Sequence, residues 1–150
     1  MRGVPRSALL LGLVAVGPFG WAALTFLSAP LAQQGTAWFG ARLTGATLAI
    51  GYGTLMLAFV SGVLCGFATR ARGGQAAFGL AVSAVPALWA FLAVGGARDA
   101  AAVNLMAGYA GILVLDWMFW RWGFCPEWWM RLRMLLTALV LVCLAVVAWA

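Results

Sequence analysis

Five apolar runs, each about as long as a bilayer is thick, constrain this chain more than any other feature of its sequence. They cover residues 7–28, 44–69, 76–94, 100–120 and 132–150. A helix needs about 20 apolar residues to cross a hydrocarbon core of about 30 Å. With 66% hydrophobic and 8% charged residues, a soluble domain of 150 residues could not cover its core with polar surface. The sequence therefore predicts an all-α, polytopic integral membrane protein, a bundle of about five transmembrane helices in one domain over residues 1–150.

The first run has a second interpretation, a cleaved signal peptide, because it follows two arginines and precedes small residues. It is longer than the usual apolar core of such a peptide, and cleavage after Ala32 would put Pro30 where a small residue is needed. We therefore expect it to remain as the first spanning helix. Residues 29–43 are interpreted as the first of the polar breaks between spans.

The distribution of arginine predicts how the bundle is oriented. Arginine is the only basic residue type, and Arg42 and Arg98 fall on one side of the membrane. The seven others fall on the opposite side, namely Arg2, Arg6, Arg70, Arg72, Arg121, Arg131 and Arg133. Basic residues in short loops are retained on the cytoplasmic face, so we expect a cytoplasmic N-terminus and a periplasmic C-terminus. The absence of lysine and the many Ala and Gly residues indicate a GC-rich bacterium and hence a bacterial inner membrane.

Several classes of function are disfavoured by the residue types present. The chain has no histidine, and its three cysteines, Cys65, Cys125 and Cys143, are far apart and form no C-x-x-C pair. Histidine is the commonest haem and metal ligand and the commonest general base, so we expect no metal, no cofactor and no catalytic residues. The arginines stand singly or in pairs between apolar runs, a pattern that does not form a nucleic-acid surface.

Asp116 is the only acidic residue inside an apolar run. A carboxylate at the bilayer centre costs about 2.5 to 3.5 kcal/mol on insertion scales, so Asp116 should find a partner or keep water. We expect a structural ion pair with Arg131 or Arg133. A proton or ion relay is the alternative, but a relay needs a succession of ionisable groups, which no other run supplies.

Residues 116–133, around the break between the fourth and fifth runs, hold five of the nine tryptophans, beside several arginines. Trp and Arg both favour the boundary between lipid and water, so this segment is interpreted as a belt that anchors the two helices. Its alternative role is a platform for lipid headgroups, a quinone or a partner protein. The candidate residues of this platform are Trp120, Arg121, Trp122, Trp128 and Trp129.

Small residues spaced four apart mark one face of the second run, at Ala58, Gly62 and Gly66. Close backbone approach over small residues holds helices together in lipid, so we expect this face to be buried against a neighbour. A substrate path past Ser61 and Cys65 is the alternative. A second stripe, Ala107, Gly108 and Gly111, lies in the fourth run, and since small residues gain nothing from lipid, at least one of the two stripes is expected to serve as an external docking face for a partner. Pro18 and Pro86 interrupt the first and third runs, where we expect kinks and carbonyls that need new donors.

A pattern of residues extends over nearly the whole chain. It comprises Pro5-Arg6, Gly12, Pro18-Phe19, Tyr52-Gly53, Ser61-Gly62, Gly66, Pro86, Asp116, Pro126, Trp128-Trp129, Arg131-Leu132-Arg133 and Leu136-Thr137. This pattern resembles the bacterial and mitochondrial membrane proteins of the family domain of unknown function 3429. The chain departs from the family at Cys65, where Trp is usual, and at Trp129, where Tyr is usual. The resemblance implies a small five-helix inner-membrane protein and brings no established activity.

These observations lead to an expected function that is not enzymatic. We expect a non-catalytic accessory or assembly subunit of a larger inner-membrane complex, possibly respiratory or otherwise energy-transducing, that contacts membrane lipids and no nucleic acid. A small oligomeric transporter or channel is the second hypothesis, and it requires a continuous polar path lined by Ser61, Thr69 and Asp116. A membrane enzyme that acts on lipid or quinone is the third.

Overall fold

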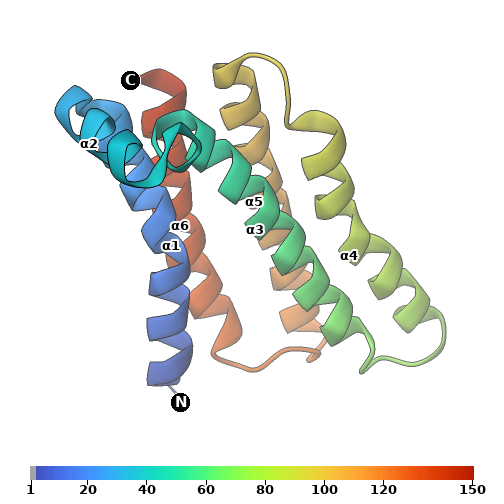
Figure 1. Cartoon of the computed structure of the whole chain (residues 1–150). Coiled ribbons are helices and arrows are strands. Elements are labelled where there is room, and N and C mark those ends of the chain that lie inside the picture. Colours follow the sequence, from blue (N-terminus) through green and yellow to red (C-terminus); the bar gives the residue numbers. More distant parts are fainter. Residues whose placement is uncertain (1–2) are drawn as a thin grey trace.

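The computed structural model describes residues 3–150, and Arg2 lies outside them. The described chain is all helical, and five of its helices are long and apolar enough to cross a membrane (Figure 1). These spans are α1 (Arg6–Leu27), α3 (Gly45–Ala68), α4 (Gly73–Ala93), α5 (Arg98–Arg121) and α6 (Trp129–Trp149). The predicted all-α fold with five spans is confirmed, and the bounds of each span lie within a few residues of those expected.

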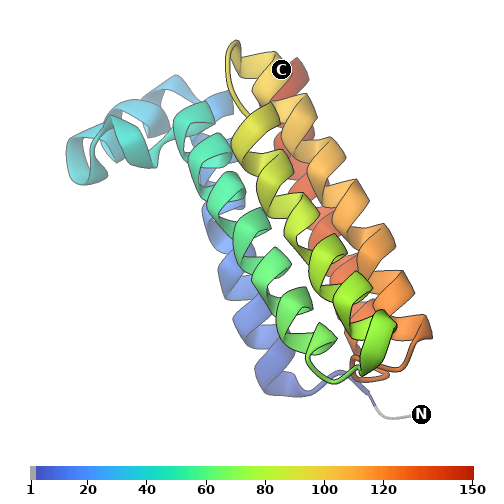
Figure 2. The same cartoon turned by 90° about the vertical axis from the view of Figure 1, so that its right-hand side faces the viewer.

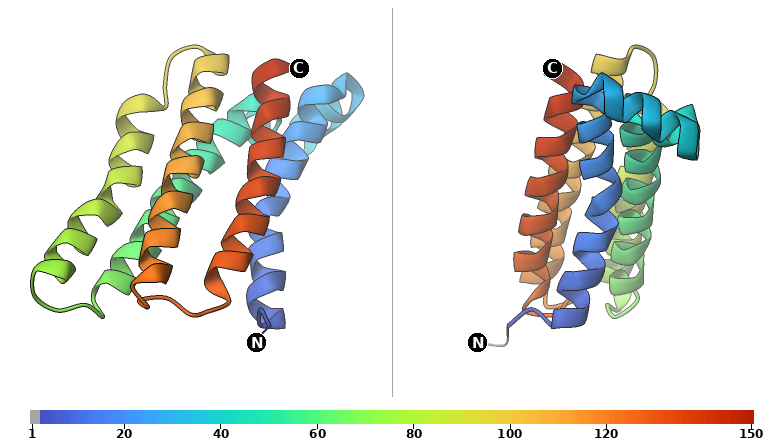
Figure 3. Two further views of the ribbon diagram at one scale, coloured as in Figure 1. Left: turned by 180° about the vertical axis from the view of Figure 1, so that it is seen from behind. Right: turned by 60° about the vertical axis from the view of Figure 1, so that its left-hand side comes forward.

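The five spans run alternately up and down in one bundle. The N-terminus, the α3–α4 loop and the α5–α6 loop lie at one end, which we call the N-terminal end, and the C-terminus lies at the other (Figures 1 and 3). Helix α3 packs against α1, α4 and α5, and α6 packs against α1 and α5. Helices α3 and α5 contact each other and carry several of the large, completely buried side chains, among them Leu57, Leu64, Leu105 and Ile112.

Two glycines allow α3 and α5 to approach closely. A Cβ atom on Gly53 of α3 would lie 2.5 Å from Leu105 Cδ2. A Cβ atom on Gly108 of α5 would lie 2.5 Å from Leu57 Cδ2 and 2.9 Å from Trp89 Cδ1. Leu57 and Leu105 are completely buried and cannot move aside cheaply. Small residues therefore hold these helices together, as expected in lipid; Gly108 belongs to the stripe named in the fourth run, whereas Gly53 lies outside the stripe named in the second.

The prediction that Ala58, Gly62 and Gly66 are buried against a neighbouring helix was wrong. Gly62 and Gly66 are exposed, and a Cβ atom on either would have nothing within 4 Å. Ala58 is only half-buried. The inward face of α3 follows its large apolar residues instead, and a spacing of four identifies a common face without saying which way it points. In the second stripe, Gly108 is buried whereas Ala107 and Gly111 are exposed.

Both prolines lie inside continuous helices, and α3 supplies a hydroxyl to each of them. Pro18 lies within α1, where Tyr52 of α3 donates a hydrogen bond to the carbonyl of Ala15, at 2.9 Å. Pro86 lies within α4, where Ser61 of α3 donates to the carbonyl of Ser83. In each case the acceptor is three residues before the proline, in the turn where the missing N–H weakens the helix. The carbonyls that lose an N–H donor lie four residues before each proline, at Val14 and Val82, so the two hydroxyls support the weakened turns without replacing the missing bonds.

Residues 29–43 are not the plain polar break that was expected. They form α2 (Ala29–Phe39) and a short 3₁₀ helix η1 (Ala41–Leu43), separated by Gly40 with a φ of 82°. Pro30 stands in the first turn of α2, where a proline costs no hydrogen bond. Helix α2 projects sideways from the bundle at the end opposite the N-terminus, beside α1 (Figures 2 and 3). It leaves Trp38 and Phe39 exposed, which suits a helix at a lipid–water boundary.

Residues of α1 hold both ends of this connecting segment. The hydroxyl of Thr25 accepts a hydrogen bond from the backbone N–H of Gly45, at 2.8 Å, and donates within α1. Trp21 donates from Nε1 to the carbonyl of Leu43, at 3.0 Å. Gly35 of α2 rests against Trp21 and Thr44, because a Cβ atom there would lie 2.9 Å from each. These contacts cannot be recognised from the hydropathy of residues 29–43, so α2 was not predicted from the sequence.

We predict that alanine at Gly108 destabilises the bundle and that alanine at Gly62 does not. Gly108→Ala forces a methyl group against Leu57 and Trp89, and overpacking of this kind costs about 1 to 3 kcal/mol. Gly62→Ala is the matched control, because its methyl group meets open space. Thermal unfolding in detergent measures both variants. Equal unfolding temperatures for the two variants would contradict the assigned inward face of the bundle.

Candidate functional site

The candidate site is a buried ion pair near the N-terminal end of the bundle. Asp116 of α5 is completely buried, and its Oδ2 lies 2.6 Å from Nε of Arg133 on α6. Trp129, in the first turn of α6, donates from Nε1 to Oδ1 of the same carboxylate, at 2.7 Å. Both carboxylate oxygens are therefore hydrogen-bonded. This arrangement offsets the cost of a buried charge and fixes the register between α5 and α6.

Helical geometry decides which arginine pairs with Asp116. Successive helix residues are about 100° apart, so Trp129 and Arg133, at i and i+4, share a face of α6. Arg131 lies about 200° from Arg133 on the same helix, and it is exposed. The structure thus brings Asp116 together with one of the two expected arginines. The i, i+4 spacing of Trp129 and Arg133 was visible in the sequence and could have singled out Arg133.

At the N-terminal end of the bundle, beside the ion pair, the α5–α6 loop folds back onto the helices. Gly123, with a φ of 74°, turns the chain so that Phe124 packs against Phe119 and Trp122. Phe78 of α4 joins this aromatic cluster through Trp122. Arg70, in the α3–α4 loop, donates to the carbonyl of Phe124 at 3.3 Å. The loop therefore closes the N-terminal end of the bundle over Asp116.

The five residues of the expected aromatic platform do not form one surface. Trp122 belongs to the inward aromatic cluster, and Trp129 binds Asp116. Trp120 and Arg121 are exposed at the end of α5, and Trp128 is half-buried beside Trp129. Arg121 stacks over the ring of Trp117, 5.6 Å from its centroid, at the position of an interfacial anchor. The segment thus divides into inward structural residues and outward residues that face the membrane boundary.

Cys125 lies in this loop and is buried. Burial raises the pKa of its thiol to about 11, and the negative charge of Asp116 adds to the increase. A thiol in this state stays protonated at neutral pH, so it is a poor nucleophile and a poor metal ligand. Among residues 3–150, no three His, Cys, Asp or Glu side chains come together in a way that could hold a metal ion.

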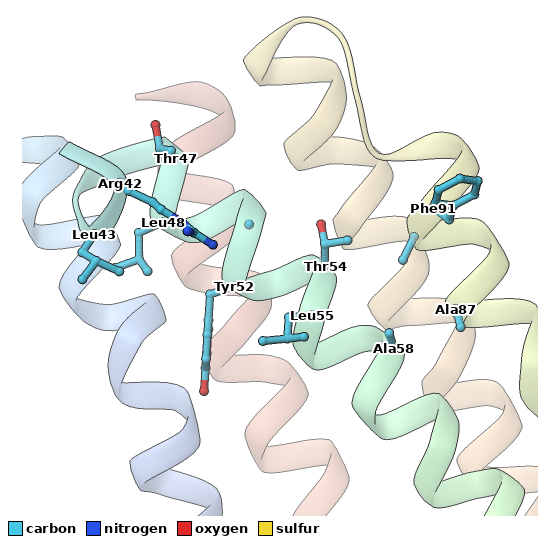
Figure 4. Close-up of a pocket in the computed structure, with 12 residues that line it drawn as sticks. Arg42, Leu43, Thr47, Leu48, Tyr52, Thr54, Leu55, Ala58, Ala87 and Phe91 are labelled. Carbon is cyan, nitrogen blue, oxygen red and sulfur yellow. The ribbon is translucent and has the colours of Figure 1, made fainter. Parts of the chain in front are cut away.

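A separate hollow of about 640 Å³ lies on the outer surface between α3 and α4 (Figure 4). It extends along α3 from Thr47 to Ala58, and Phe91 of α4 stands on its opposite side. Arg42 of η1 lies at one end of the hollow, beside Leu48. This hollow, which we call the α3–α4 groove, is therefore lined mainly by apolar side chains and has one cationic side chain at its end.

We predict that removing the Asp116 carboxylate destabilises the protein far more than removing the Arg131 charge. Asp116→Ala leaves the buried guanidinium of Arg133 without its counter-ion, which costs on the order of 3 kcal/mol. Arg131→Ala removes an exposed arginine and should change the free energy of unfolding by less than about 1 kcal/mol. Reversible unfolding of both variants in detergent would give the comparison. An Asp116→Ala variant as stable as the parent protein would show that the pair is not needed.

We predict that Cys125 resists thiol reagents in the folded protein. In a variant with Cys65→Ser and Cys143→Ser, maleimide labelling near pH 8 should be about a hundredfold slower than for an ordinary thiol. The reason is that raising the pKa from 9.0 to about 11 lowers the thiolate fraction by that factor. The rate should increase with pH up to about 11, and unfolding in a strong detergent should make labelling fast. Rapid labelling of the folded variant at pH 8 would contradict the closed loop.

Comparison with known proteins identifies a family and no characterised relative. No curated protein and no solved structure is significantly similar to the chain. The family described as protein of unknown function (DUF3429) matches residues 4–149, which is nearly the whole chain and includes every residue of the ion-pair site. The chain therefore belongs to the DUF3429 family.

Proposed function

We propose that this protein is a non-catalytic accessory or assembly subunit of a larger inner-membrane complex, such as a respiratory or other energy-transducing complex. We further propose that a partner helix docks on the outer face of α3. The observation that carries the proposal is the exposure of Gly62 and Gly66, which have open space where a Cβ atom would lie. Small residues gain nothing from lipid, but they allow another helix to approach closely.

The outer face of α3 has the form of a helix-docking surface. Leu55, Phe59, Gly62, Cys65 and Gly66 are all exposed and recur at intervals of one to four residues along one side of the helix. The large side chains lie nearer mid-span and the glycines lie nearer the N-terminal end. A partner helix would therefore approach most closely near that end, beside the arginines of the α3–α4 loop.

The limited burial of the spans also supports a partner. In the most apolar part of each span, only 22% to 39% of the residues are buried within the bundle. Both oxygens of Asp116 are hydrogen-bonded to α6, and Ser61 is bonded to α4. Residues that the transporter hypothesis assigned to one path are thus bound to different helices. These contacts favour a structural role for Asp116 and Ser61, and they leave the exposed small residues of α3 available to contact a partner helix.

We assign the groove between α3 and α4 to a membrane phospholipid. From Thr47 to Ala58 the groove follows twelve residues of α3, a rise of about 16 Å, which is about half the thickness of a hydrocarbon core and hence the depth of one leaflet. Arg42 at the mouth of the groove has no ion-pair partner among the described residues. Its guanidinium would bind the lipid phosphate, and the apolar wall would hold an acyl chain.

We also propose that the N-terminal end of the bundle faces the cytoplasm and the C-terminus faces the periplasm. Arg6, Arg70, Arg72, Arg121 and Arg131 belong to helix ends and loops at the N-terminal end, whereas Arg42 and Arg98 belong to the opposite end (Figure 1). Basic residues in short loops favour the cytoplasmic face, so this separation supports the orientation.

We predict that reporters at the C-terminus work only in the periplasm. A C-terminal alkaline phosphatase fusion should be active, and a C-terminal green fluorescent protein fusion exported through the same route should be dark. Fusions in the α3–α4 loop should give the reverse pattern. A fluorescent C-terminal fusion without phosphatase activity would overturn the orientation.

We predict that Gly62→Leu separates the protein from its complex without unfolding it. Gentle extraction of native membranes should recover the parent chain in a stoichiometric larger complex, and Gly62→Leu should release it because the leucine blocks the close approach. Gly17→Leu on α1, where the glycine also meets open space, should leave the complex intact. A parent protein that stays monomeric or only self-associates, and that moves a solute in liposomes, would favour the transporter hypothesis instead.

A further inference from the structure

A small, partly open cavity lies between α1, α3, α5 and α6. Its volume is about 40 Å³, and its lining includes Tyr109, Arg133 and Thr137 among apolar side chains. Arg133 reaches it from the ion pair with Asp116, and Thr137 follows one turn later on α6. The cavity therefore joins the candidate site to the centre of the bundle.

Two buried polar atoms at this cavity have no hydrogen-bond partner within the described chain. They are Nη2 of Arg133 and Oγ1 of Thr137, on side chains that are 6% and 2% exposed. A buried donor or acceptor that stays unpaired costs about 1 to 3 kcal/mol, and more when it is charged. Two such atoms beside one cavity indicate that the cavity holds a hydrogen-bonding ligand.

The orientation of Thr137 strengthens this indication. Three other hydroxyls of the spans, on Thr25, Thr54 and Ser83, bond to a backbone carbonyl in the preceding turn. That local bond is the usual way to satisfy a hydroxyl inside a membrane helix. Thr137 makes no such bond, although it is equally buried. Its hydroxyl is thus left available to the cavity.

Charge and size together define the ligand. Asp116 already neutralises Arg133, so an added anion or cation would leave an uncompensated charge in a low-dielectric site. The ligand must therefore be neutral and polar. A water molecule occupies about 30 Å³ in the liquid, so a cavity of about 40 Å³ has room for one.

We propose that this cavity binds one water molecule, which joins Arg133, Thr137 and Tyr109. The water accepts a hydrogen bond from Nη2 of Arg133 and exchanges one with the hydroxyl of Thr137. It donates to the oxygen of Tyr109, whose own proton is given to the carbonyl of Gly53 at 3.0 Å. Three partners are the usual number for a buried water.

The bound water completes a hydrogen-bond chain across three helices. The chain runs from Gly53 of α3 through Tyr109 of α5 and the water to Arg133 of α6, and then to Asp116. The water also replaces part of the solvation that the guanidinium loses on burial. The residues that line the site do not include Gly62 or Gly66, so the proposed water site stands independently of the proposed docking on α3.

Solid-state nuclear magnetic resonance of the full chain in phosphatidylethanolamine–phosphatidylglycerol vesicles tests the proposal. Transfer of magnetisation from water protons should reach the Arg133 Nη and Thr137 side chains, whereas Ser83, which is bonded to a carbonyl, should receive severalfold less. Thr137→Val should reduce transfer to Arg133 Nη severalfold, because the water loses a partner. Thr137→Ser should retain it. An unchanged Arg133 Nε signal in both variants would show that the ion pair is intact.

Three results would overturn the proposal. Transfer to Arg133 and Thr137 no greater than to Ser83 would show that the cavity is dry. A shift of the Arg133 Nη signal when chloride in the buffer is replaced by nitrate would show that the occupant is an anion. Retention of full transfer to Arg133 in Thr137→Val would also contradict it, because the hydroxyl would then have no part in binding.

Discussion

A buried ion pair between α5 and α6 is the interaction on which the N-terminal end of this protein depends. Asp116 cannot face lipid uncompensated, and Arg133 and Trp129 together occupy both of its oxygens. Because Trp129 and Arg133 share a face of α6, their hydrogen bonds to the one carboxylate fix both the rotation and the register of α6. The aromatic loop then closes over the pair through Phe119, Trp122 and Phe124.

The same requirement, that polar groups in lipid be satisfied from within, explains the central position of α3. Its hydroxyls on Tyr52 and Ser61 reach the turns that Pro18 and Pro86 weaken, and its Gly53 carbonyl accepts the proton of Tyr109. One helix therefore supports α1, α4 and α5 from its inward side. Its outward side needs none of these residues, which leaves Gly62 and Gly66 free for the partner helix that we propose.

Features of the fold could be predicted from the sequence where a single physical requirement determines them. Hydropathy locates the five spans because a bilayer requires long apolar runs, and a lone carboxylate in such a run points to an ion pair. The direction of the Gly62 and Gly66 face could not be predicted, because it is decided by the burial of Leu57, Leu64 and Ala68, which lie on a different face of α3.

Helix α2 was not predicted because contacts of Trp21, Thr25 and Gly35, rather than hydropathy, hold this segment in place. The Thr137 cavity likewise arises only when four helices meet.

A double-mutant cycle on the ion pair tests the central claim most directly. The free energies of unfolding would be measured for Asp116→Asn, Arg133→Gln, the double variant and the parent protein in the same bilayer-mimicking detergent. A pair that organises α5 and α6 should give a coupling free energy of about 2 kcal/mol, with the double variant more stable than the sum of the single changes implies. Strict additivity, with a coupling near zero, would contradict the claim that this pair sets the packing of the last two spans.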